Sequence, residues 1–541
     1  MYQEASIQVG PNSPTNMCEV ERLRSIIQYL PSAKVNFIEE VESILSKTGP
    51  GHNTETAYDT AWVARLGDLL PEEAGRALTW LRKSQLSDGS WGVERPIYYH
   101  DRILCTLSAV IALQDNGDEV DRDRIKRALL IMQEHICKLH LDPAGATAGF
   151  EMLLPVLLEE AHRVGIIVSF PEKVMLRIHE ARRRKIALIP NGIVSRHVTM
   201  AFSAEMAGSN GREILDCDNL TEANGSVALS PSATAFYLLN LCPDDQNAQA
   251  YIKTIAQEGA PNFAPFDIYE KAWVVWNLLH VDLSDFPSLE DMISPIVDSL
   301  HASWDYGKGV GFSDDFSPRD ADDTAVVFEV LSNYGIDMPI ADLLRYEEID
   351  HFRCFDLETH TSTGANIHML GALFCAGYGK YTKPVQKILR YLRKTQIDAC
   401  MWVDKWHISP YYITAHAVIV FANYHLNLGK NSVHWMIETQ NSDGSWGYQF
   451  PTAEETAYCL QALVVWQQHG FFVPIETILK GYCWLKNHLN DPIVPLWTAK
   501  TLYSPTLVVR TAILSALLMV EQAELELAEA EYEKEKVIYP F

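Results

Sequence analysis

Apolar residues recur through most of the chain at the spacing of an α-helix, and segments with glycine, proline or asparagine separate one apolar run from the next. Such runs occupy 105–114, 150–164, 325–335, 457–470 and 508–531. Because apolar residues at i, i+3 and i+4 lie on one face of a helix, each run is typical of an amphipathic helix. No run alternates apolar and polar residues between turn signals, as a half-buried strand would. The pattern predicts an all-α protein built from short antiparallel helix pairs.

One segment occurs in two distant places, as RALTWLRKSQLSDGSWG at 76–92 and VHWMIETQNSDGSWG at 433–447. Each copy has a helix with an aromatic residue, then a glutamine, an Asp-Gly turn and Trp-Gly. Copies this far apart indicate one copy in each of two related helical domains rather than a local array. We expect the glutamine to bridge a helix end to the following turn and the tryptophan to cover that turn.

The chain has 541 residues, of which 48% are hydrophobic. This length exceeds what one ordinary core accommodates, so we expect two or three domains. The 44 basic and 70 acidic residues give a formal charge of −26. That charge argues against broad contact with a nucleic acid backbone, so an anionic substrate would need a local basic pocket or a divalent metal.

The ten cysteines form no CxxC pair. Scattered cysteines of this kind are typical of reduced thiols in a cytosolic protein rather than of a disulfide framework or a zinc site. No charged segment followed by an apolar one opens the chain, and no uninterrupted apolar run of about 18 residues is present. We therefore expect a cytoplasmic protein without an integral membrane segment.

The stretch RDADDTA at 319–325 places three aspartates within four positions, just before an apolar helical run. Carboxylates so close together raise one another's proton affinity, so the cluster can hold a proton for use. A second interpretation is that the aspartates cap the helix that follows, where negative charge suits the helix dipole. A calcium loop fits less well, because the central glycine and terminal glutamate of an EF-hand are missing.

Several motifs, in order along nearly the whole chain, resemble those of class II diterpene cyclases of the copalyl diphosphate synthase type. Beside the two QxxDGSWG repeats, they are AYDTAWVA at 57–64, GFEMLLPVLLEEA at 149–161, SPSATAF at 230–236, PNFAPFD at 261–267, the DxDD motif DADD at 320–323, DKWHISPYY at 404–412 and LWTAKTLYSPTLVVR at 496–510. DxDD alone is weak evidence, but the ordered set is specific.

The resemblance implies two α-helical double (α/α) barrel domains, named β and γ, with the active site between them. The expected boundaries are 1–49 for the N-terminal segment of the β domain, 50–270 for the inserted γ domain and 271–541 for the main part of the β domain with DxDD. The α domain of ionisation-dependent terpene synthases would carry DDxxD and a metal-binding triad, and neither motif is found. The resemblance therefore implies that the diphosphate is retained through the reaction.

In this family the middle aspartate of DxDD protonates an alkene, and here it is Asp322, with Asp320 and Asp323 supporting it. Protonation of an isolated alkene requires a strong acid that is shielded from water. The segment STGANIHML at 362–370 resembles the one that supplies a hydrogen-bond partner for the acid. Asn366 and His368 are the candidates, and a merely structural buried pair is the alternative.

The carbocation that follows needs π-faces, which stabilise it without trapping it. Each candidate aromatic residue taken alone could equally be a core residue. The candidates are Trp304, Phe312, Trp406, Tyr411, Tyr412 and Tyr458.

The substrate implied by the resemblance is geranylgeranyl diphosphate, whose head needs cations. ARRRK at 181–185 occupies the place where the family has a diphosphate-binding lysine, so Lys185 is the first candidate, followed by Arg184, Lys500 and Arg510. Each could instead be a solvated surface residue. The resemblance also implies Mg²⁺ as cofactor, with Glu151 as its candidate ligand.

One departure from the family concerns the terminating base. Plant enzymes of the ent series carry a histidine at the position of Phe202, and it works with an asparagine matching Asn262 to hold the water that removes the last proton. Here the asparagine is present and the histidine is absent, and His197 is not at the matching position. We expect another copalyl stereoisomer or a rearranged halimane or clerodane skeleton.

Alternatives remain at this point. A farnesyl diphosphate (drimane-type) cyclase would differ only in substrate length, and a squalene-hopene-type triterpene cyclase shares the fold and DxDD but is longer. An (α/α) barrel glycosidase would need two carboxyls on separate elements, and a non-catalytic binding module would need no acid. A downstream class I terpene synthase is the expected partner.

Overall fold

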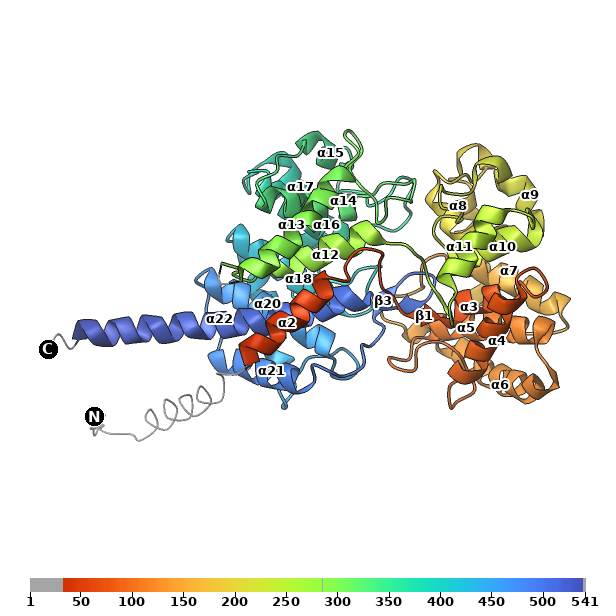
Figure 1. Cartoon of the computed structure of the whole chain (residues 1–541), viewed down its shortest axis with the longest axis horizontal. Helices are drawn as coiled ribbons and strands as arrows, with labels where there is room; N and C mark the ends of the chain where they lie inside the picture. The colour runs from red at the N-terminus through yellow and green to blue at the C-terminus, as the bar shows by residue number, and fades with distance from the viewer. Residues whose placement is uncertain (1–32, 285, 539–541) are drawn as a thin grey trace, which may run out of the picture.

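Almost all regular structure in the computed structural model, which describes residues 33–284 and 286–538, is helical (Figure 1). Within these residues the strands form two short antiparallel pairs. One pairs β1 (Glu55–Thr56) with β2 (Ala260–Pro261), and the other pairs β3 (Trp497–Thr498) with β4 (Leu502–Tyr503). The all-α class predicted from the apolar periodicity is confirmed.

The helices form two groups, which lie side by side in Figure 1. The first group consists of α3 (Ala57–Ala64), α4 (Pro71–Ser84), α5 (Tyr99–Asn116), α6 (Arg122–Lys138), α7 (Phe150–Arg163), α8 (Glu172–Ile186), α9 (Gly211–Ile214), α10 (Pro231–Asn240) and α11 (Gln246–Ile255). A 3-10 segment, η4 (Thr199–Asn210), packs against α7 and α10.

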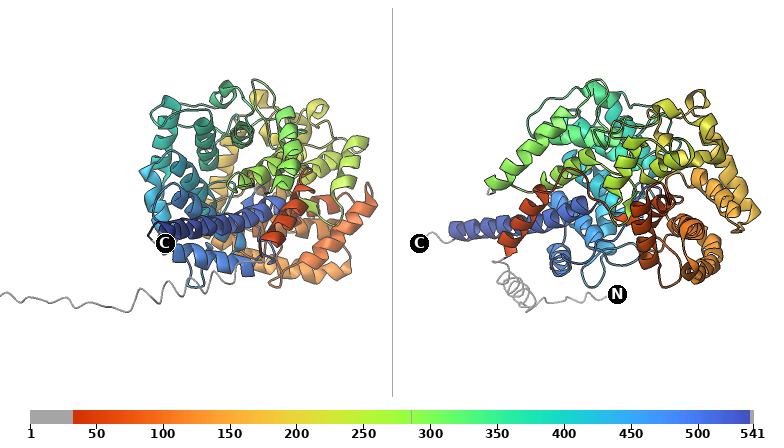
Figure 2. Two further views of the ribbon diagram at one scale, coloured as in Figure 1. Left: turned by 60° about the vertical axis from the view of Figure 1, so that its left-hand side comes forward. Right: turned by 45° about the vertical axis from the view of Figure 1, so that its right-hand side comes forward.

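The second group contains the acidic motif. It consists of α2 (Ala33–Leu45), α12 (Asp267–Leu278), α13 (Pro287–Ala302), α14 (Ala321–Asn333), α15 (Ile340–Leu344), α16 (Thr363–Cys375), α17 (Lys383–Thr395), α18 (Pro410–Asn423), α19 (Lys430–Glu438), α20 (Ala453–Gln468), α21 (Ile475–Asn487) and α22 (Thr506–Ile538). Helix α2 precedes the first group in sequence but packs against α13 and α22 of the second, as the views in Figures 1 and 2 show.

Each group has its own hydrophobic core. Residues between Ala57 and Ala260, with Phe316, form one core, and the apolar residues of α2 join those between Ile268 and Val520 in the other. Phe202 and Phe263 pack against both cores, so they lie where the two groups meet. The segment 1–32, predicted to belong to the second group, lies outside the described residues.

The two QxxDGSWG repeats have the same hydrogen bonds. The side-chain amide of Gln85 donates to the carbonyl of Gly89 at 2.8 Å, and that of Gln440 donates to Gly444 at 2.9 Å. Each glutamine also donates to a carbonyl in a neighbouring helix, and each following tryptophan is buried with its indole N–H bonded to a backbone carbonyl. The predicted structural role of the repeat is confirmed.

Helix α22 contains the window Thr506–Ala523, which is long and apolar enough to cross a membrane, and the other described helices do not meet that test. Because 72% of this window is buried inside the protein, α22 serves here as a core helix. Eight cysteines in the described ranges, from Cys105 to Cys459, are free.

Candidate active site

A cavity of 560 Å³ lies between the two groups of helices and receives side chains from both. Its walls are mostly aromatic and apolar, and several acidic and basic residues also line it. From the first group it is lined by Glu151, Lys185, Met200, Phe202 and Phe263, and from the second by Tyr269, Trp273, Phe312, Phe316, Asp320, Asp322, Asp323, Phe355, Glu358, His360, Asp404, Lys405, Trp406, Tyr412, Trp497 and Tyr503. An apolar cavity of this size with a few convergent polar groups is typical of a small-molecule site.

The three aspartates of DADD begin helix α14 and divide two tasks. Asp320 is the N-cap residue, with extended backbone, and its side chain accepts a hydrogen bond from the backbone N–H of Asp323 at 2.9 Å. Asp322 makes no such bond and presents a side chain that is 15% exposed to the cavity. The capping interpretation therefore applies to Asp320, which leaves Asp322 free for chemistry.

Burial changes the protonation of the two flanking carboxyls. It raises the pKa of Asp320 to about 7, despite the N–H groups that oppose the change. Burial and the adjacent charge of Asp320 raise the pKa of Asp323 well above its usual range. The cluster therefore retains protons near neutral pH, as an acid for alkene protonation requires.

The partner of Asp322 is His368 on α16. The Nδ1 atom of His368 lies 2.6 Å from Oδ1 of Asp322, and the histidine side chain is 1% exposed. Burial alone would lower the pKa of His368, but the charge and hydrogen bond of Asp322 outweigh it, so the pKa is raised. The other candidate, Asn366, bonds the backbone of Phe352 and Ser362 and does not contact the acid.

Three of the six predicted wall residues line the cavity, namely Phe312, Trp406 and Tyr412. The other three lie behind it. The indole N–H of Trp304 donates to Asp342 at 2.9 Å, Tyr411 stacks on Trp435, and the hydroxyl of Tyr458 donates to Glu454 at 3.0 Å. The structure thus places these three in the core rather than in the wall.

Sequence reasoning missed an aromatic surface that faces the acid. Tyr269 and Trp273 on α12 stack with ring centroids 4.4 Å apart, and Trp273 meets the ring of His368 edge-on at 5.6 Å. Trp497 and Tyr503 complete the same wall from the short strands β3 and β4. All four lie in or beside motifs that resemble those of the family. Their closeness to these motifs is the sequence signal that could have identified them.

Two ammonium groups line the cavity, each paired with a carboxylate. Lys185 on α8 forms an ion pair with Glu151 on α7, and Lys405 lies 3.0 Å from Glu358. His360 lies among these charges, and burial together with Lys185 lowers its pKa. Lys405, which follows the aspartate of DKWHISPYY, was absent from the predicted set.

The other predicted cations do not reach the cavity. Arg184 is exposed on α8, whereas Arg510 bonds the carbonyl of Leu489 and the side chain of Asn490. Arg184 faces solvent and Arg510 lies beside the second core. Neither residue is among those that line the cavity. Their predicted contact with diphosphate therefore does not fit the geometry.

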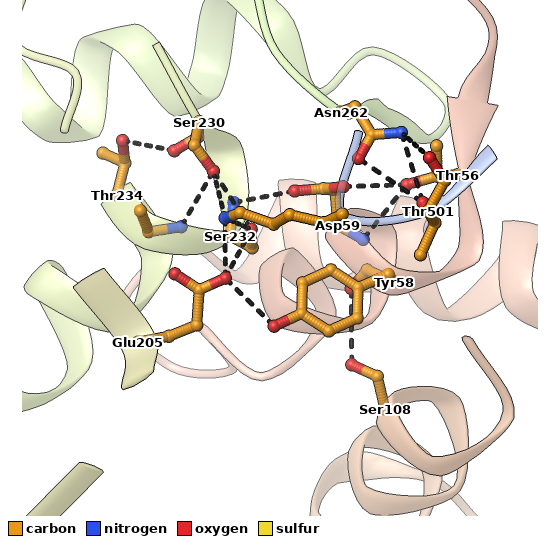
Figure 3. A network of polar contacts seen from close by, with 12 residues as sticks. Thr56, Tyr58, Asp59, Ser108, Glu205, Ser230, Ser232, Thr234, Asn262 and Thr501 are labelled. Atoms are coloured by element: carbon orange, nitrogen blue, oxygen red, sulfur yellow. Dashed lines mark hydrogen bonds and ion pairs between the residues drawn. The ribbon is translucent and has the colours of Figure 1, made fainter. Parts of the chain in front are cut away.

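Lys500 is also withdrawn from the cavity. Its ammonium is fully buried and donates to Oε1 of Glu205 at 2.6 Å and to the hydroxyls of Ser230 and Ser232, both at 2.7 Å. Figure 3 shows Glu205, Ser230 and Ser232 converging beside Asp59. The predicted contact with diphosphate is at odds with this burial, because all three N–H groups are used to tie the loop before β4 to the first helix group.

Asn262 belongs to the same network and does not line the cavity. Its amide donates to the carbonyl of Thr501 at 3.3 Å and to the hydroxyl of Thr501 at 3.2 Å (Figure 3). Phe202 does line the cavity, and the ammonium of Lys500 lies 4.6 Å from its ring centroid. The position matched to the histidine of the plant ent-series enzymes therefore has an aromatic ring against a buried cation.

The residues fit a Mg²⁺ ion only as part of a complex with substrate. No group of three or more metal-binding side chains occurs among the residues that the structure describes. Mg²⁺, however, usually binds through one or two carboxylates together with substrate phosphates and water. Glu151 and Glu358 both line the cavity, so such a mixed coordination is compatible with this site.

Comparison with known proteins places the chain in a family. Residues 333–469 match the family described as squalene-hopene cyclase C-terminal domain. The chain is 40% identical to a type B diterpene cyclase of Mycobacterium tuberculosis over 500 residues, which cover 90% of this chain and 100% of that protein. It is 28% identical to a (+)-kolavenyl diphosphate synthase of Herpetosiphon aurantiacus over 526 residues, covering 91% of this chain and 98% of the other.

The solved structures agree with the sequence relatives. An ent-copalyl diphosphate synthase from Streptomyces platensis superposes with a TM-score of 0.73 at 25% identity, covering 90% of this chain and 100% of that chain. The fold, the site and the relatives lead to one conclusion: the chain belongs to the class II diterpene cyclases, a family of terpene-cyclising enzymes.

Proposed function

We propose that this enzyme converts geranylgeranyl diphosphate into a bicyclic diterpenyl diphosphate by protonating the alkene farthest from the diphosphate. The observation that carries the proposal is a single cavity that brings together a carboxylic acid, aromatic walls and two ammonium groups. The acid begins the reaction at Asp322, and Lys185 and Lys405 hold the retained diphosphate.

Asp322 is built to transfer a proton into the cavity. Its Oδ1 atom is occupied by His368, and its side chain is 15% exposed and lines the cavity. A proton on Oδ2 therefore faces the substrate, and the carboxylate left behind remains bonded to the histidine. General acids placed in this way typically contribute about 10²–10⁴-fold to the rate.

The cation that forms then lies among rings that stabilise it without forming bonds to it. Trp273, Tyr269 and Phe312 offer π-faces or edges in the wall of the cavity that the acid also lines. Such contacts contribute about 0.5–2 kcal/mol each, more where water is excluded. The walls thereby favour ring closure over capture by water.

The diphosphate head is proposed to lie between Lys185 and Lys405, which approach from different helix groups. When bound, Mg²⁺ would neutralise part of the diphosphate charge, and Glu151 is the residue proposed to hold it. Lys185 would then meet the negative charge of the diphosphate, and Glu151 would meet the positive charge of the ion. Arg184 is exposed and has no part in this arrangement.

The final deprotonation is proposed to occur late. Phe202 has no basic atom, and Asn262 bonds Thr501 rather than facing the cavity. A cation that is not deprotonated at once can undergo hydride and methyl shifts, so a rearranged halimane or clerodane skeleton, or another copalyl stereoisomer, is the proposed product. The similarity to a (+)-kolavenyl diphosphate synthase supports this choice.

The retained diphosphate makes the product a substrate for an ionising enzyme, so a class I terpene synthase is the proposed downstream partner. A cytoplasmic location is proposed from the eight free cysteines between Cys105 and Cys459. Farnesyl diphosphate is the second candidate substrate, because the charged residues that would bind its head are the same.

The test is to incubate the purified protein with geranylgeranyl diphosphate and Mg²⁺, treat the mixture with phosphatase and analyse the alcohols by gas chromatography with mass detection. A cyclic C20 alcohol from the unmodified enzyme, absent from Asp322→Asn with an unchanged circular dichroism spectrum, is the expected result. Recovery of geranylgeraniol alone from both proteins would overturn the proposal and lead to farnesyl diphosphate and squalene as the next substrates.

A further inference from the structure

The acid is the first member of a hydrogen-bonded chain that continues into the core. The Nε2 atom of His368 lies 2.8 Å from Nδ1 of His416, which is 1% exposed on α18. Asp322, His368 and His416 thus connect three helices, α14, α16 and α18, of which α16 packs against both others.

We propose that His416 and Glu329 are positioning residues that hold His368 as an imidazolium, so that the transferable proton of Asp322 lies on the oxygen that faces the cavity. This inference rests on the proposed role of Asp322 as the acid. It concerns two residues that do not line the cavity.

Each ring nitrogen of His368 has its own hydrogen-bond partner. Nδ1 contacts Asp322 and Nε2 contacts His416, so only the imidazolium donates hydrogen bonds at both positions. If His368 is neutral and donates from Nε2 to His416, its Nδ1 can only accept a hydrogen bond. The proton of Asp322 must then lie on Oδ1. In the other tautomer Nδ1 still donates to Oδ1, but the ring has no positive charge to strengthen Asp322 as an acid. A neutral His368 therefore leaves the proton of Asp322 either on the wrong oxygen or on a weaker acid.

His416 is suited to accept rather than to donate. Burial lowers the pKa of His416 well below the ordinary value, and so do the neighbouring His368, His280 and His407. The ring therefore stays neutral. Its Nε2 atom is buried without a hydrogen-bond partner in the described residues. The proton of a neutral His416 can therefore remain on Nε2, which leaves the Nδ1 lone pair for His368.

Glu329 supplies a counter-charge. It lies two turns after Asp322 on α14, is 6% exposed, and its Oε2 atom has no hydrogen-bond partner within the described part of the chain. A methyl group at position 371 of α16 would come within 2.8 Å of that oxygen. Because this residue is Gly371, there is room for the carboxyl of Glu329. Burial raises the pKa of Glu329 to about 7, with the Trp276 indole and His368 opposing the change.

The other groups around His368 agree with this assignment. The charge of Asp322 favours the protonated form of His368 only while that carboxyl is ionised, whereas the charges of Glu329 on α14 and Asp404 before α18 favour it also when Asp322 holds its proton. Helix α12 contributes the rings of Trp273 and Trp276, and His280 follows its end. Burial lowers the pKa of His280 to about 4, so that histidine adds no positive charge near neutral pH.

The sign of the pH effect follows from these contacts. The active enzyme needs His368 protonated, so activity is lost as the pH rises through the pKa of His368. Removing the acceptor in His416→Phe, or the negative charge in Glu329→Gln, destabilises the imidazolium. The alkaline limb of the kcat profile should then move by about one unit to lower pH.

The test measures kcat and KM for geranylgeranyl diphosphate as functions of pH for His416→Phe, Glu329→Gln and the matched control His280→Gln. We expect kcat at neutral pH to fall at least about tenfold in His416→Phe, with KM nearly unchanged, because the acid and not substrate binding is affected. The control changes no charge and no bond to His368, so its alkaline limb should stay in place.

Unshifted alkaline limbs in both variants would overturn the inference, as would a loss of kcat that follows only a loss of thermal stability. Nitrogen NMR of the labelled wild-type enzyme covers the case in which a variant fails to fold. Protons on both ring nitrogens of His368 at neutral pH are expected, and a neutral ring contradicts the proposal. An inactive wild-type enzyme would instead refute the proposed function, while the NMR result would still decide the charge of His368.

Discussion

The ammonium of Lys500 lies 2.6 Å from a carboxylate oxygen of Glu205, and neither side chain is more than 1% exposed. The two residues come from different helix groups, and each group has its own hydrophobic core. This buried ion pair, with Ser230 and Ser232, fixes the wall behind Phe202. Lys500, which the sequence suggested as a substrate ligand, therefore has a structural role.

Lys500→Met should destabilise the protein strongly. Removing one partner of a buried ion pair leaves the other charge unpaired, at a cost of about 3–5 kcal/mol. Thermal and urea unfolding followed by circular dichroism measure the loss. The double variant with Glu205→Gln should be more stable than Lys500→Met alone, and equal stability of the single and double variants would show that the carboxylate is not stranded.

Lys185→Ala and Lys405→Ala should each raise KM for geranylgeranyl diphosphate by about tenfold, since hydrogen bonds to charged groups contribute about 1.5–3 kcal/mol. Steady-state kinetics at fixed Mg²⁺ measure the effect. The neighbouring exposed Arg184→Ala is the matched control and should leave KM unchanged. An equal rise in KM for all three variants would indicate a diffuse electrostatic effect and no specific head-group site.

Phe202→His should shift the product mixture toward the unrearranged bicycle. The imidazole would place a proton acceptor in the cavity wall where the wild-type ring has none. Gas chromatography of the dephosphorylated products measures the ratio, with Phe202→Leu as a control for lost ring volume. A wild-type enzyme whose sole product is the unrearranged ent bicycle would contradict the account of late deprotonation.

The free energy of unfolding should fall as the pH rises from about 4 to 7. Burial raises the pKa of Asp320 to about 7 and that of Asp59 to about 7, above the value of about 3.9 for an unfolded chain. Such groups bind protons more tightly in the folded state. Their contribution to stability is therefore fully present below the pKa of the unfolded state and is lost as the pH rises through the pKa of the folded state.

Asp320→Asn tests this pH dependence in isolation, because asparagine also caps a helix but does not titrate. Urea midpoints at several pH values should show a shallower decline than in the wild type. An unchanged slope would mean that Asp320 is ionised in the folded protein throughout this range.

The sequence predicted the helices and the acid because both depend on local pattern. Apolar periodicity located α14, and the DxDD motif with its neighbours identified Asp322 at its first turn. The choice between Asn366 and His368 could not be made, since two residues apart on one helix point in different directions. Only the packing of α16 against α14 shows which of them reaches the acid.

The positions of Lys500 and Asn262 depend on contacts across more than two hundred residues of chain, which no local pattern records. The core roles of Trp304, Tyr411 and Tyr458 have the same origin, because a buried aromatic looks alike in sequence whether it faces a cavity or a helix. The domain boundaries 1–49, 50–270 and 271–541 and the binding of Mg²⁺ stay predictions.

The most direct test of the central claim is to run the reaction in deuterium oxide and determine the mass of the product after phosphatase treatment. Asp322 exchanges its proton with solvent, whereas the proton lost at the end comes from the substrate. The account predicts a cyclic alcohol with one deuterium on carbon, released only by phosphatase and absent from Asp322→Asn. A product without deuterium, or one that has lost its diphosphate before phosphatase is added, would contradict it.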